Sequence, residues 1–452
     1  MTTLTANHAA YEEAALRPVV QKPGLLWWGI FGVLTVTMAA GLFAYSYQLR
    51  QGLGVTGLGQ RVSWGFYISN LVFFIGISYG GAITSAILRL TNAPWRAPLT
   101  RLAEAMAVSA LLVGALFPII DLGRPDHLPQ LFLHGQVGSP VLWDVVAIST
   151  YLAASLVFIY LPLIPDIALC RDRLSRSTGR LKRTIYRVFA LGWDGRAEQR
   201  RILNQGMTVL AILIIPLAVS VHSVLAWLFG VTVRPGWNST IFAPYFVMGA
   251  MYSGVATVIL VMAAFRRAYH LEDYITIQHF RYLSYMLLVL ALGYLYFMVS
   301  EYLTEGYKMH EGTGALLDLL LLGRLAPFFW LFVVGGLLLP VAVVAVPATR
   351  TIPLLSLAAA AAVLGMWLKR FLIVVPSLAE SISPSTNLTI YHPSWVEITI
   401  TLAATAAIPW FLMLFFRFFP VISIFEMDEV AEAEASHYRH EPLGEALPAG
   451  GK

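Results

Sequence analysis

The stretch FPIIDLGRPDHLPQLFLHGQVGSPVLWDVVAISTY, residues 117–151, joins two long apolar segments through a loop with almost no basic residues. It places two carboxylates, Asp121 and Asp144, at the edges of those segments. A carboxylate is costly in hydrocarbon, so acids within apolar segments usually serve a function. The sequence therefore predicts a functional loop at one face of a membrane protein, held in place by the rest of the chain.

The composition is that of a membrane protein. Of the 452 residues, 58% are hydrophobic and only 12% are charged, whereas a soluble protein carries about 25% charged residues. The chain has one cysteine, Cys170, so it cannot form an internal disulfide, a cluster held by several thiolates or a thiolate zinc site. Glu12 and Glu13 precede an apolar stretch that is too long for a signal peptide. We therefore expect an all-α polytopic membrane protein whose first apolar stretch remains as a helix.

Long apolar runs predict the membrane spans. A helix needs about 20 residues to cross a hydrocarbon core of about 30 Å. Ten runs approach or exceed that length: residues 26–48, 64–88, 102–121, 141–165, 207–229, 244–265, 280–303, 325–346, 353–376 and 395–419. The chain is therefore expected to cross the membrane about ten times.

The basic residues predict the orientation. Lys and Arg gather on the cytoplasmic side of a membrane. With the N-terminus placed there, that side receives 22 of the 30 basic residues and the outer side six. The remaining two, Lys369 and Arg370, lie inside the ninth predicted span. Both termini are therefore expected in the cytoplasm, and the net charge of +5 reflects topology, not a nucleic-acid partner.

Two segments on the cytoplasmic side have a biased composition. The loop 171–205 contains the basic run RLKRTIYRVFALGWDGRAEQRR, which is either a topological anchor or a helix lying on anionic lipid. The tail 426–452 is rich in Glu and Ala and contains His437 and His440. We expect this tail to be disordered or to face a partner.

An internal repeat predicts how the spans are grouped. Six residues recur at an offset of 173: Trp64, Phe73, Gly76, Tyr79, Gly81 and Thr84 match Trp237, Phe246, Gly249, Tyr252, Gly254 and Thr257. Six matches in an apolar window can also arise by chance. The two copies open spans two and six and run in the same direction, and glycines at these spacings let helices approach closely. The repeat predicts two parallel four-helix bundles, spans two to five and six to nine, flanked by spans one and ten.

This grouping predicts six divisions of the chain. They are a cytoplasmic tail, the first span with its outer loop, the two bundles, the last outer loop with the tenth span, and the acidic tail: residues 1–25, 26–63, 64–229, 230–376, 377–425 and 426–452.

Ionisable residues fall in one layer near the outer face. By the rise of 1.5 Å per helical residue, this layer holds three acids, a histidine and three basic residues: Asp121, Asp144, Glu301, His222, Arg124, Lys369 and Arg370. Ionisable groups inside membrane spans are rare and mark sites of proton, ion or ligand chemistry. We therefore predict acid–base chemistry at the outer face.

Each of these residues also has a structural interpretation. Asp121 and Arg124 have the spacing of an ion pair at a helix end. Asp144, beside Trp143, lies where an acid stabilises a helix N-terminus. His222 is the only histidine deep in a predicted span, and it is either a hydrogen-bonding residue of the core or a proton relay or ligand contact.

Three further residues have two interpretations as well. Lys369 and Arg370 either extend to the membrane surface or balance the acids. Glu104, on the inner side, either compensates a helix dipole or takes part in proton entry. Haem b would need a second buried histidine at the depth of His222, and no nucleotide-binding motif follows a plausible strand. The sequence therefore predicts no redox cofactor of its own, and acid–base chemistry on a lipid-soluble compound.

Several motifs resemble one family of membrane proteins. The stretches WGFYISNLVFFIGISYGG, RLAEAMAVSALLVGALFPIIDLGRP and SPVLWDVVAISTYL are similar to the NrfD/PsrC family of quinol-interacting membrane subunits. In the second half, SVHSVLAW, GWNSTIFAPYFVMGAMYSG, KRFLIVVPSL and HPSWVEI resemble the ActC subunit of alternative complex III. The resemblance covers spans two to ten in order. It leaves out the N-terminal tail, the basic loop and the acidic tail.

The resemblance implies a ten-helix subunit in the bacterial inner membrane, with a bound quinone or quinol and without a haem or iron–sulfur cluster of its own. The quinol is ubiquinol or menaquinol. The implied partners are an extracytoplasmic iron–sulfur subunit, cytochrome c subunits and a second NrfD-like membrane subunit. By its place in the motifs, Asp144 is the site carboxylate, His222 lies on a proton route and Glu104 lies at the inner side of that route. One position departs from the pattern, because ActC-like chains usually have a histidine where Asp121 precedes LGRP.

These observations predict oxidation of quinol at the outer face. Asp144 is expected to act as the base, since a carboxylate held near a quinol hydroxyl can accept its proton, and Asp121 is the expected second acceptor. Arg124 and Trp143 are expected to bind quinol or hold the loop. His222 would relay a proton or hydrogen-bond the quinone. The electrons would pass to the iron–sulfur partner.

The sequence also predicts a proton route, although it leaves open whether protons are pumped. Its expected members are one acid on the inner side, a tyrosine, and four residues of the outer layer: Glu104, Tyr79, His222, Glu301, Lys369 and Arg370.

Two other functions are compatible with a polytopic chain. A secondary transporter usually shows an inverted repeat whose broken helices meet at the midplane. Here the repeat is parallel and the ionisable groups gather near one face, which argues against transport. A passive membrane anchor for a peripheral redox enzyme would use the outer acids for docking.

Overall fold

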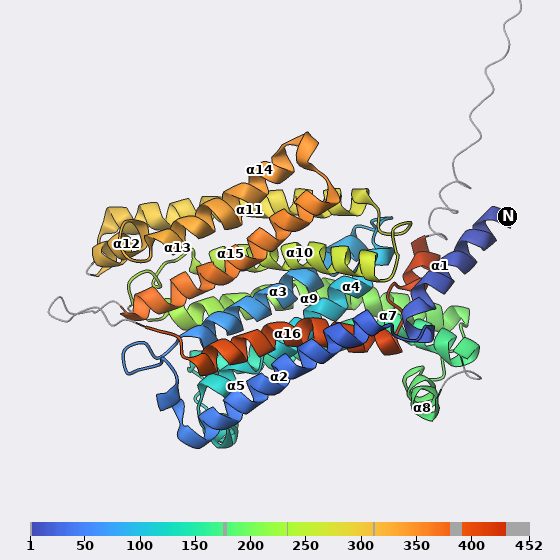
Figure 1. Ribbon diagram of the computed structural model, residues 1–452, viewed down its shortest axis with the longest axis horizontal. Coiled ribbons are helices and arrows are strands. Elements are labelled where there is room, and N and C mark those ends of the chain that lie inside the picture. Colours follow the sequence, from blue (N-terminus) through green and yellow to red (C-terminus); the bar gives the residue numbers. More distant parts are fainter. Residues whose placement is uncertain (1, 175–178, 233, 311, 380–390, 431–452) are drawn as a thin grey trace, which may run out of the picture.

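The computed structural model describes residues 2–174, 179–232, 234–310, 312–379 and 391–430. Within these ranges, ten helices are long and apolar enough to cross a membrane, which confirms the predicted number. They lie side by side as an elongated bundle (Figure 1). The protein is therefore an all-α, multi-pass membrane protein.

The spanning helices have the following bounds: α2 (Leu25–Gln51), α3 (Phe66–Leu90), α4 and α5 together (Ala97–Gly114 and Phe117–Asp121), α7 (Pro140–Leu174), α9 (Ala197–Gly230), α10 (Phe242–Ala268), α11 (Ile277–Lys308), α13, η3 and α14 together (Ala326–Leu331, Phe332–Leu338 and Leu339–Ala345), α15 (Ile352–Ala379) and α16 (Trp395–Phe418). Shorter elements lie between them: α1 (Thr2–Val20), η1 (Leu53–Val55), η2 (Pro125–His127), α6 (Leu128–Leu133), α8 (Arg180–Phe189), α12 (Thr313–Leu321) and η4 (Pro347–Thr349).

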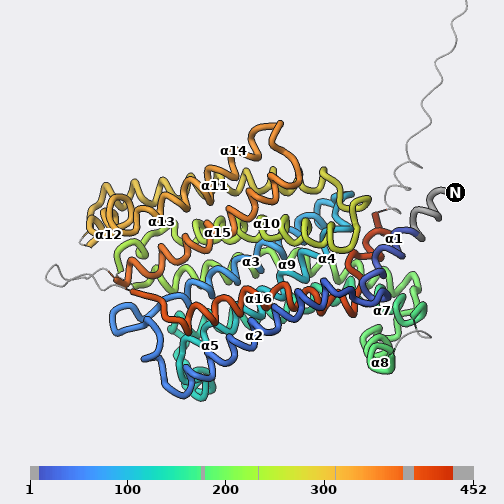
Figure 2. The backbone as a smooth tube through the Cα atoms, viewed as in Figure 1, coloured from blue at the N-terminus to red at the C-terminus, as the bar shows by residue number. Residues whose placement is uncertain are grey.

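The two ends of the bundle carry different segments (Figure 2). We call the end with α1, α8 and residues 419–430 the terminal face, because both ends of the described chain lie there. We call the opposite end, with residues 52–65, residues 122–139 and α12, the loop face. The predicted inner side corresponds to the terminal face, and the predicted outer side corresponds to the loop face.

The helices pack in two groups. Helices α3, α4, α7 and α9 pack against one another, and so do α10, α11, α14 and α15. Helix α3 packs along α10 and joins the groups, while α2 and α16 pack together beside the first group. This packing supports the proposed division into two four-helix bundles, which we call the first and the second bundle.

Small residues let the helices of the two bundles touch. Where α3 crosses α10, a Cβ atom added at Gly80 would lie 2.5 Å from the Cα atom of Gly254, so no larger residue fits without moving a backbone. At the loop face the rings of the repeat-related Trp64 and Trp237 stack, with centroids 5.9 Å apart. Three of the repeat residues, Trp64, Trp237 and Gly254, therefore lie at the junction between the bundles.

The basic loop 171–205 is more helical than a simple connector. Helix α7 continues to Leu174 and α9 begins at Ala197, so only the part between them lies outside the two spanning helices. Within that part, α8 is attached to the end of α16. Lys182 Nζ donates to the carbonyl of Arg417 at 2.8 Å, and Tyr186 Oη donates to the carbonyl of Phe418 at 2.8 Å. Residues 175–178 lie outside the described ranges.

Both terminal segments differ from the expected tails. Residues 2–20 form the helix α1, and Tyr11 on it is buried and donates a hydrogen bond to the carbonyl of Ser423 at 3.2 Å. The prediction of a disordered tail from residue 426 is wrong for residues 426–430, because Glu426 and Glu429 bind arginines of the bundle. Residues 431–452, with His437 and His440, lie outside the described ranges.

Candidate functional site

Asp144 lies at the loop-face end of the first bundle. Helix α7 begins at Pro140, so Asp144 is about one turn inside it. The side chain is buried, with a residue exposure of 5%, and its Oδ1 atom has no hydrogen-bond partner among the described residues. A buried oxygen without a partner is a strong hydrogen-bond acceptor for a ligand that enters the site. Asp144 is therefore a buried acceptor at the loop face, and its role as the site carboxylate stays a prediction.

Asp121 ends α5 on the same face and is half-buried. Its Oδ1 atom also lacks a partner among the described residues. The backbone just before it is fixed, because Gln48 Nε2 donates to the carbonyl of Ile120 at 2.9 Å, and Tyr67 Oη donates to Gln48 Oε1 at 2.5 Å. Gln48 and Tyr67 were not predicted as site residues, although a glutamine inside an apolar span is itself a signal in the sequence.

Arg124 and Trp143 lie in exposed positions of the loop. Arg124 Nη2 forms an ion pair with Asp126 Oδ2 at 3.1 Å, not the pair with Asp121 that its spacing allowed. The hydrogen bond from Arg124 lowers the pKa of the Asp126 carboxyl below its ordinary value. Trp143 is 40% exposed, and its indole N–H donates to the carbonyl of Val137. Both side chains therefore fasten the loop, and a role in quinol binding stays a prediction.

His222 and Tyr79 meet in the interior of the first bundle. Their ring centroids are 5.1 Å apart, and both side chains are buried. Neither ring nitrogen of His222 has a hydrogen-bond partner among the described residues, nor does the Tyr79 hydroxyl. Gly76 leaves the space for the imidazole, because a Cβ atom there would lie 3.5 Å from His222 Nε2. The two predicted members of the proton route are thus in contact.

A second tyrosine connects Asp144 to the same region. Tyr151 lies seven residues, about two turns, after Asp144 on α7, so the two side chains share a helix face. Tyr151 is fully buried, and its hydroxyl is 3.4 Å from the hydroxyl of Ser78, the residue before Tyr79. Sequence analysis missed Tyr151 and Ser78, although the i, i+7 spacing of Tyr151 from Asp144 would have found the tyrosine.

Glu104 lies deep in the bundle on the side of the terminal face. Because α4 begins at Ala97 and not at residue 102, Glu104 is about two turns into the helix. A role in compensating the helix dipole, which acts within the first turn, therefore does not apply. Ser85 Oγ donates to Glu104 Oε1 at 2.7 Å, and Oε2 is buried with no partner among the described residues.

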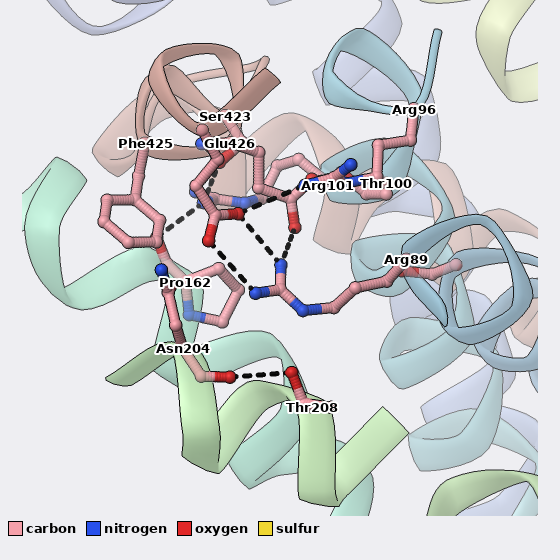
Figure 3. Close-up of polar contacts among 12 residues, drawn as sticks. Arg89, Arg96, Thr100, Arg101, Pro162, Asn204, Thr208, Ser423, Phe425 and Glu426 are labelled. Carbon is pink, nitrogen blue, oxygen red and sulfur yellow. Dashed lines mark hydrogen bonds and ion pairs between the residues drawn. The ribbon is translucent and has the colours of Figure 1, made fainter. Parts of the chain in front are cut away.

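A cluster of buried ion pairs joins α3 and α4 to the segment after α16 (Figure 3). Arg89 binds Glu426 at 3.2 Å, and the Thr100 hydroxyl donates to the same carboxylate. One turn before Glu104, Arg101 binds Asp166 at 2.9 Å, with both side chains almost fully buried. From the sequence, these arginines were predicted only to mark the cytoplasmic side. The structure shows that they hold the segment after α16 against α4 and α7.

Lys369 and Arg370 lie inside the second bundle. Their residue exposures are 1% and 2%, which excludes the alternative that they extend to the membrane surface. Lys369 Nζ donates to Tyr302 Oη at 2.6 Å, and the Arg370 guanidinium lies over the ring of Phe246 at 4.9 Å from its centroid. Glu301 Oε2 accepts a hydrogen bond from Ser239 Oγ. The predicted layer therefore falls into one cluster in each bundle.

A second buried histidine lies at the start of α11. His279 is also buried, so His222 is not the only buried histidine among the described residues. His279 lies one residue before the predicted span 280–303, so the length of the apolar run did not indicate its burial. The backbone N–H of Thr276 donates to His279 Nδ1 at 3.1 Å, which caps α11.

Glu397 is fully buried and accepts hydrogen bonds from Tyr391 Oη at 2.5 Å and from the Gly57 N–H at 2.6 Å. Glu397 thus ties α16 to the loop before α3.

The comparison with known families decides the identity of the fold. A family model described as "Polysulphide reductase, NrfD" matches residues 54–380, which include both bundles. The chain belongs to the NrfD family. The match confirms the resemblance to this family that the sequence motifs indicated.

Relatives of this NrfD-family chain are subunits of redox enzymes. A protein of Halobacterium salinarum, provisionally named as a membrane subunit of a dimethyl sulfoxide reductase, is 30% identical over 75% of this chain and 74% of its own length. A selenate reductase subunit of Mesobacillus selenatarsenatis is 26% identical over 77% of this chain and 81% of its own. The integral membrane subunit of an Hdr-like menaquinol oxidoreductase of Archaeoglobus fulgidus is 23% identical over 79% of this chain and 81% of its own.

Proposed function

We propose that this chain is the quinol-reacting membrane subunit of a multi-subunit oxidoreductase complex. Membership of the NrfD family and similarity to subunits of reductases and of a menaquinol oxidoreductase support a role in such a complex. The observation that carries the proposal is the buried carboxylate of Asp144, whose Oδ1 atom has no partner among the described residues. In an apolar site, a quinol hydroxyl is a suitable donor to that oxygen.

The reaction at this site is oxidation of quinol to quinone with release of two protons and two electrons. One hydroxyl of the quinol donates to Asp144 Oδ1, and its O–H bond breaks as the carboxylate takes the proton. Asp121, which also has an unpartnered Oδ1 atom, takes the second proton or passes it to the loop face. The two electrons go to an iron–sulfur subunit docked on the loop face. Arg124 and Trp143 hold the loop that covers the site.

A polar route leads from this site through the first bundle. Tyr151 and Ser78 lie between Asp144 and the Tyr79–His222 pair, and Ser85 lies two turns beyond Ser78 on α3. Ser85 in turn binds Glu104 on the side of the terminal face. These groups accept and donate protons, so they support proton movement between Glu104 and the quinol site.

We also propose the orientation and the nearest branch of the family. The terminal face carries most of the basic residues outside the spans, which supports its placement in the cytoplasm of a bacterial cell. The motifs of the second half support an ActC-like subunit, with cytochrome c subunits and a second NrfD-like subunit as further partners. Co-purification through this chain, with mass spectrometry of the intact complex, identifies those partners.

Replacement of Asp144 tests the proposal. Asp144→Asn keeps the size of the side chain and removes its proton affinity, so we expect quinol oxidation by the assembled complex to fall about a hundredfold, the usual contribution of a general base. Asp273→Asn is the matched control, because it makes the same change at an exposed position in the loop between α10 and α11, away from the site. An Asp144→Asn complex with normal assembly and undiminished quinol oxidation would refute the assignment.

A further inference from the structure

The second bundle contains a small cavity near the loop face, whose lining is mostly apolar with a few polar side chains. It has a volume of about 40 Å³, and its polar lining includes Glu301, Glu305, Tyr302, Thr313 and Lys369. A water molecule needs about 10–15 Å³ of such volume, so the cavity has room for about three waters. Sites for drug-sized ligands measure about 300–1,000 Å³. The cavity therefore fits water and not a quinone ring.

The groups around the cavity have unused hydrogen-bonding capacity. Glu301 Oε1 and Glu305 Oε2 are buried and have no hydrogen-bond partner among the described residues. Lys369 Nζ has three donors, one of which Tyr302 accepts. Buried polar groups without protein partners are usually satisfied by ordered water. Three waters in the cavity would bridge the two carboxylates and the lysine.

The site is an altered copy of the one in the first bundle. Residues 101–121 and 281–301 both begin with Arg, share Met, Leu and Phe at the sixth, twelfth and seventeenth positions, and end with an acid. Glu301 therefore occupies the place in the second bundle that Asp121 occupies in the first. In addition, Gly249 leaves space for Arg370 Nη2 as Gly76 leaves space for His222 Nε2. Arg370 is thus the counterpart of His222.

The counterpart of Asp144 is missing. Helix α7 begins with Pro140 and has Trp143 three residues later, while the third helix of the second bundle has Pro327 and then Trp330 at the same spacing. The residue after that tryptophan is Asp144 in the first bundle and Leu331 in the second. The second bundle therefore keeps an acid that can hold a proton and lacks the carboxylate proposed to accept the first proton of the quinol.

We propose that the Glu301–Glu305–Lys369 cavity is a hydrated proton-loading site, an inference that rests on the proposed function of the first bundle. In the loading step a cavity hydronium gives its proton to the Glu301 carboxylate: an O–H bond of the hydronium breaks, one forms on Glu301, and water stays behind. Release to the loop face reverses the step. The charged and titratable groups that face or influence Glu301 are Glu305, Lys308, Tyr302, Lys369, Tyr245 and Arg370.

Arg370 provides the connection to the first bundle. It lies against Gly249 of α10, and the next residue, Ala250, lies against Gly76 beside His222. His222 and Arg370 thus reach the same turn of α10 from opposite bundles. Charges in a buried setting interact strongly, so a proton that reaches His222 during turnover would be repelled by the fixed charge of Arg370. This repulsion is the coupling that the proposal requires between His222 and the cavity beside Lys369.

The experiment compares proton movement with quinol oxidation in the intact complex in liposomes. For Glu301→Gln we expect the number of protons moved per electron to fall by half or more, while quinol oxidation with an ionophore stays within twofold of the wild type. Glu272→Gln, the same change at an exposed loop position, should alter neither. An infrared difference spectrum on reduction should also lose a carboxyl carbonyl band in Glu301→Gln.

Two results would overturn the inference. One is an unchanged proton-to-electron ratio and infrared spectrum in Glu301→Gln; the other is a matching loss of quinol oxidation, which would place Glu301 in the redox site itself. If Glu301→Gln does not assemble, Glu305→Gln is measured in its place, and the same two results would overturn the inference. Glu305 is suitable because it lines the same cavity and its Oε2 atom has no partner among the described residues. Failure of the proposed function is seen separately, as undiminished quinol oxidation in Asp144→Asn.

Discussion

Gly80 of α3 and Gly254 of α10 bring the two bundles into backbone contact. A Cβ atom at Gly80 would lie 2.5 Å from the Cα atom of Gly254, and the next nearest atoms are also backbone atoms of α10. Because a backbone cannot move aside as a side-chain end can, this contact sets the distance between the bundles. It also sets the position of His222 relative to Arg370.

Gly254→Ala is therefore expected to destabilise the subunit. An added methyl group in a packed interior costs about 1–3 kcal/mol, and here it must push α3 away from α10. The measurement is thermal unfolding of the purified protein in detergent. Gly32→Ala in α2 is the matched control, since a Cβ atom there meets nothing within 4 Å. Equal melting temperatures for the two variants would contradict the tight contact.

Asp166→Asn should release the segment after α16 at the terminal face. Asp166 binds Arg101 at 2.9 Å and also accepts a hydrogen bond from the Phe425 N–H at 3.1 Å. Removing one partner of a buried ion pair leaves the other charge uncompensated and costs about 3–5 kcal/mol. We expect a lower unfolding temperature and faster proteolysis after residue 418. A variant with wild-type protection would show that the ion pair does not hold this segment.

Glu397→Gln should loosen the loop before α3 while leaving the bundles intact. The carboxylate accepts hydrogen bonds from Tyr391, from the Gly57 N–H and from the Ser394 N–H at 2.9 Å. Bonds to a charged acceptor contribute about 1.5–3 kcal/mol each, and an amide has one acceptor oxygen in place of two. We expect faster cleavage by trypsin at Arg61. Ser394→Ala, which removes only the helix cap, should have a smaller effect; the opposite order would contradict this role.

Glu104→Gln tests the route through the first bundle. The variant keeps a partner for Ser85 but cannot carry a proton, so we expect fewer protons taken up from the terminal face per electron. Quinol oxidation in detergent, where no gradient forms, should stay near the wild-type rate. Ser85→Ala should slow proton uptake to a smaller extent. Unchanged proton uptake in liposomes containing Glu104→Gln would show that protons do not pass this residue.

The number of spans and the family were predictable from the sequence because each depends on local patterns. Hydrophobic length predicts crossings, and motifs such as the one around Asp144 lie in continuous stretches. Helix ends were less predictable. Helix α7 continues to Leu174 beyond the apolar run, since a helix does not end where hydrocarbon ends. Residues 426–430 are held by arginines far away in the sequence, which composition does not reveal.

The internal geometry of the site was the least predictable. Depth along a helix placed Asp121, Asp144 and Lys369 in one layer, but depth does not say toward which neighbour a side chain points. That direction depends on helix rotation, which is set by contacts such as Gly80 with Gly254. The layer itself divides between the two bundles because Asp121 and Asp144 lie on spans of the first bundle and Lys369 lies on a span of the second. The contact of Tyr151 with Ser78 and the cavity beside Lys369 emerged only from the three-dimensional structure.

The central claim is that quinol binds in the first bundle at the loop face, against Asp144. The most direct measurement is photo-crosslinking of the assembled complex with a photoreactive quinone, followed by digestion and mass spectrometry. The account predicts that the label falls within residues 117–151 and that excess unmodified quinone abolishes it. Labelling confined to the second bundle, or labelling that excess quinone does not reduce, would contradict the account.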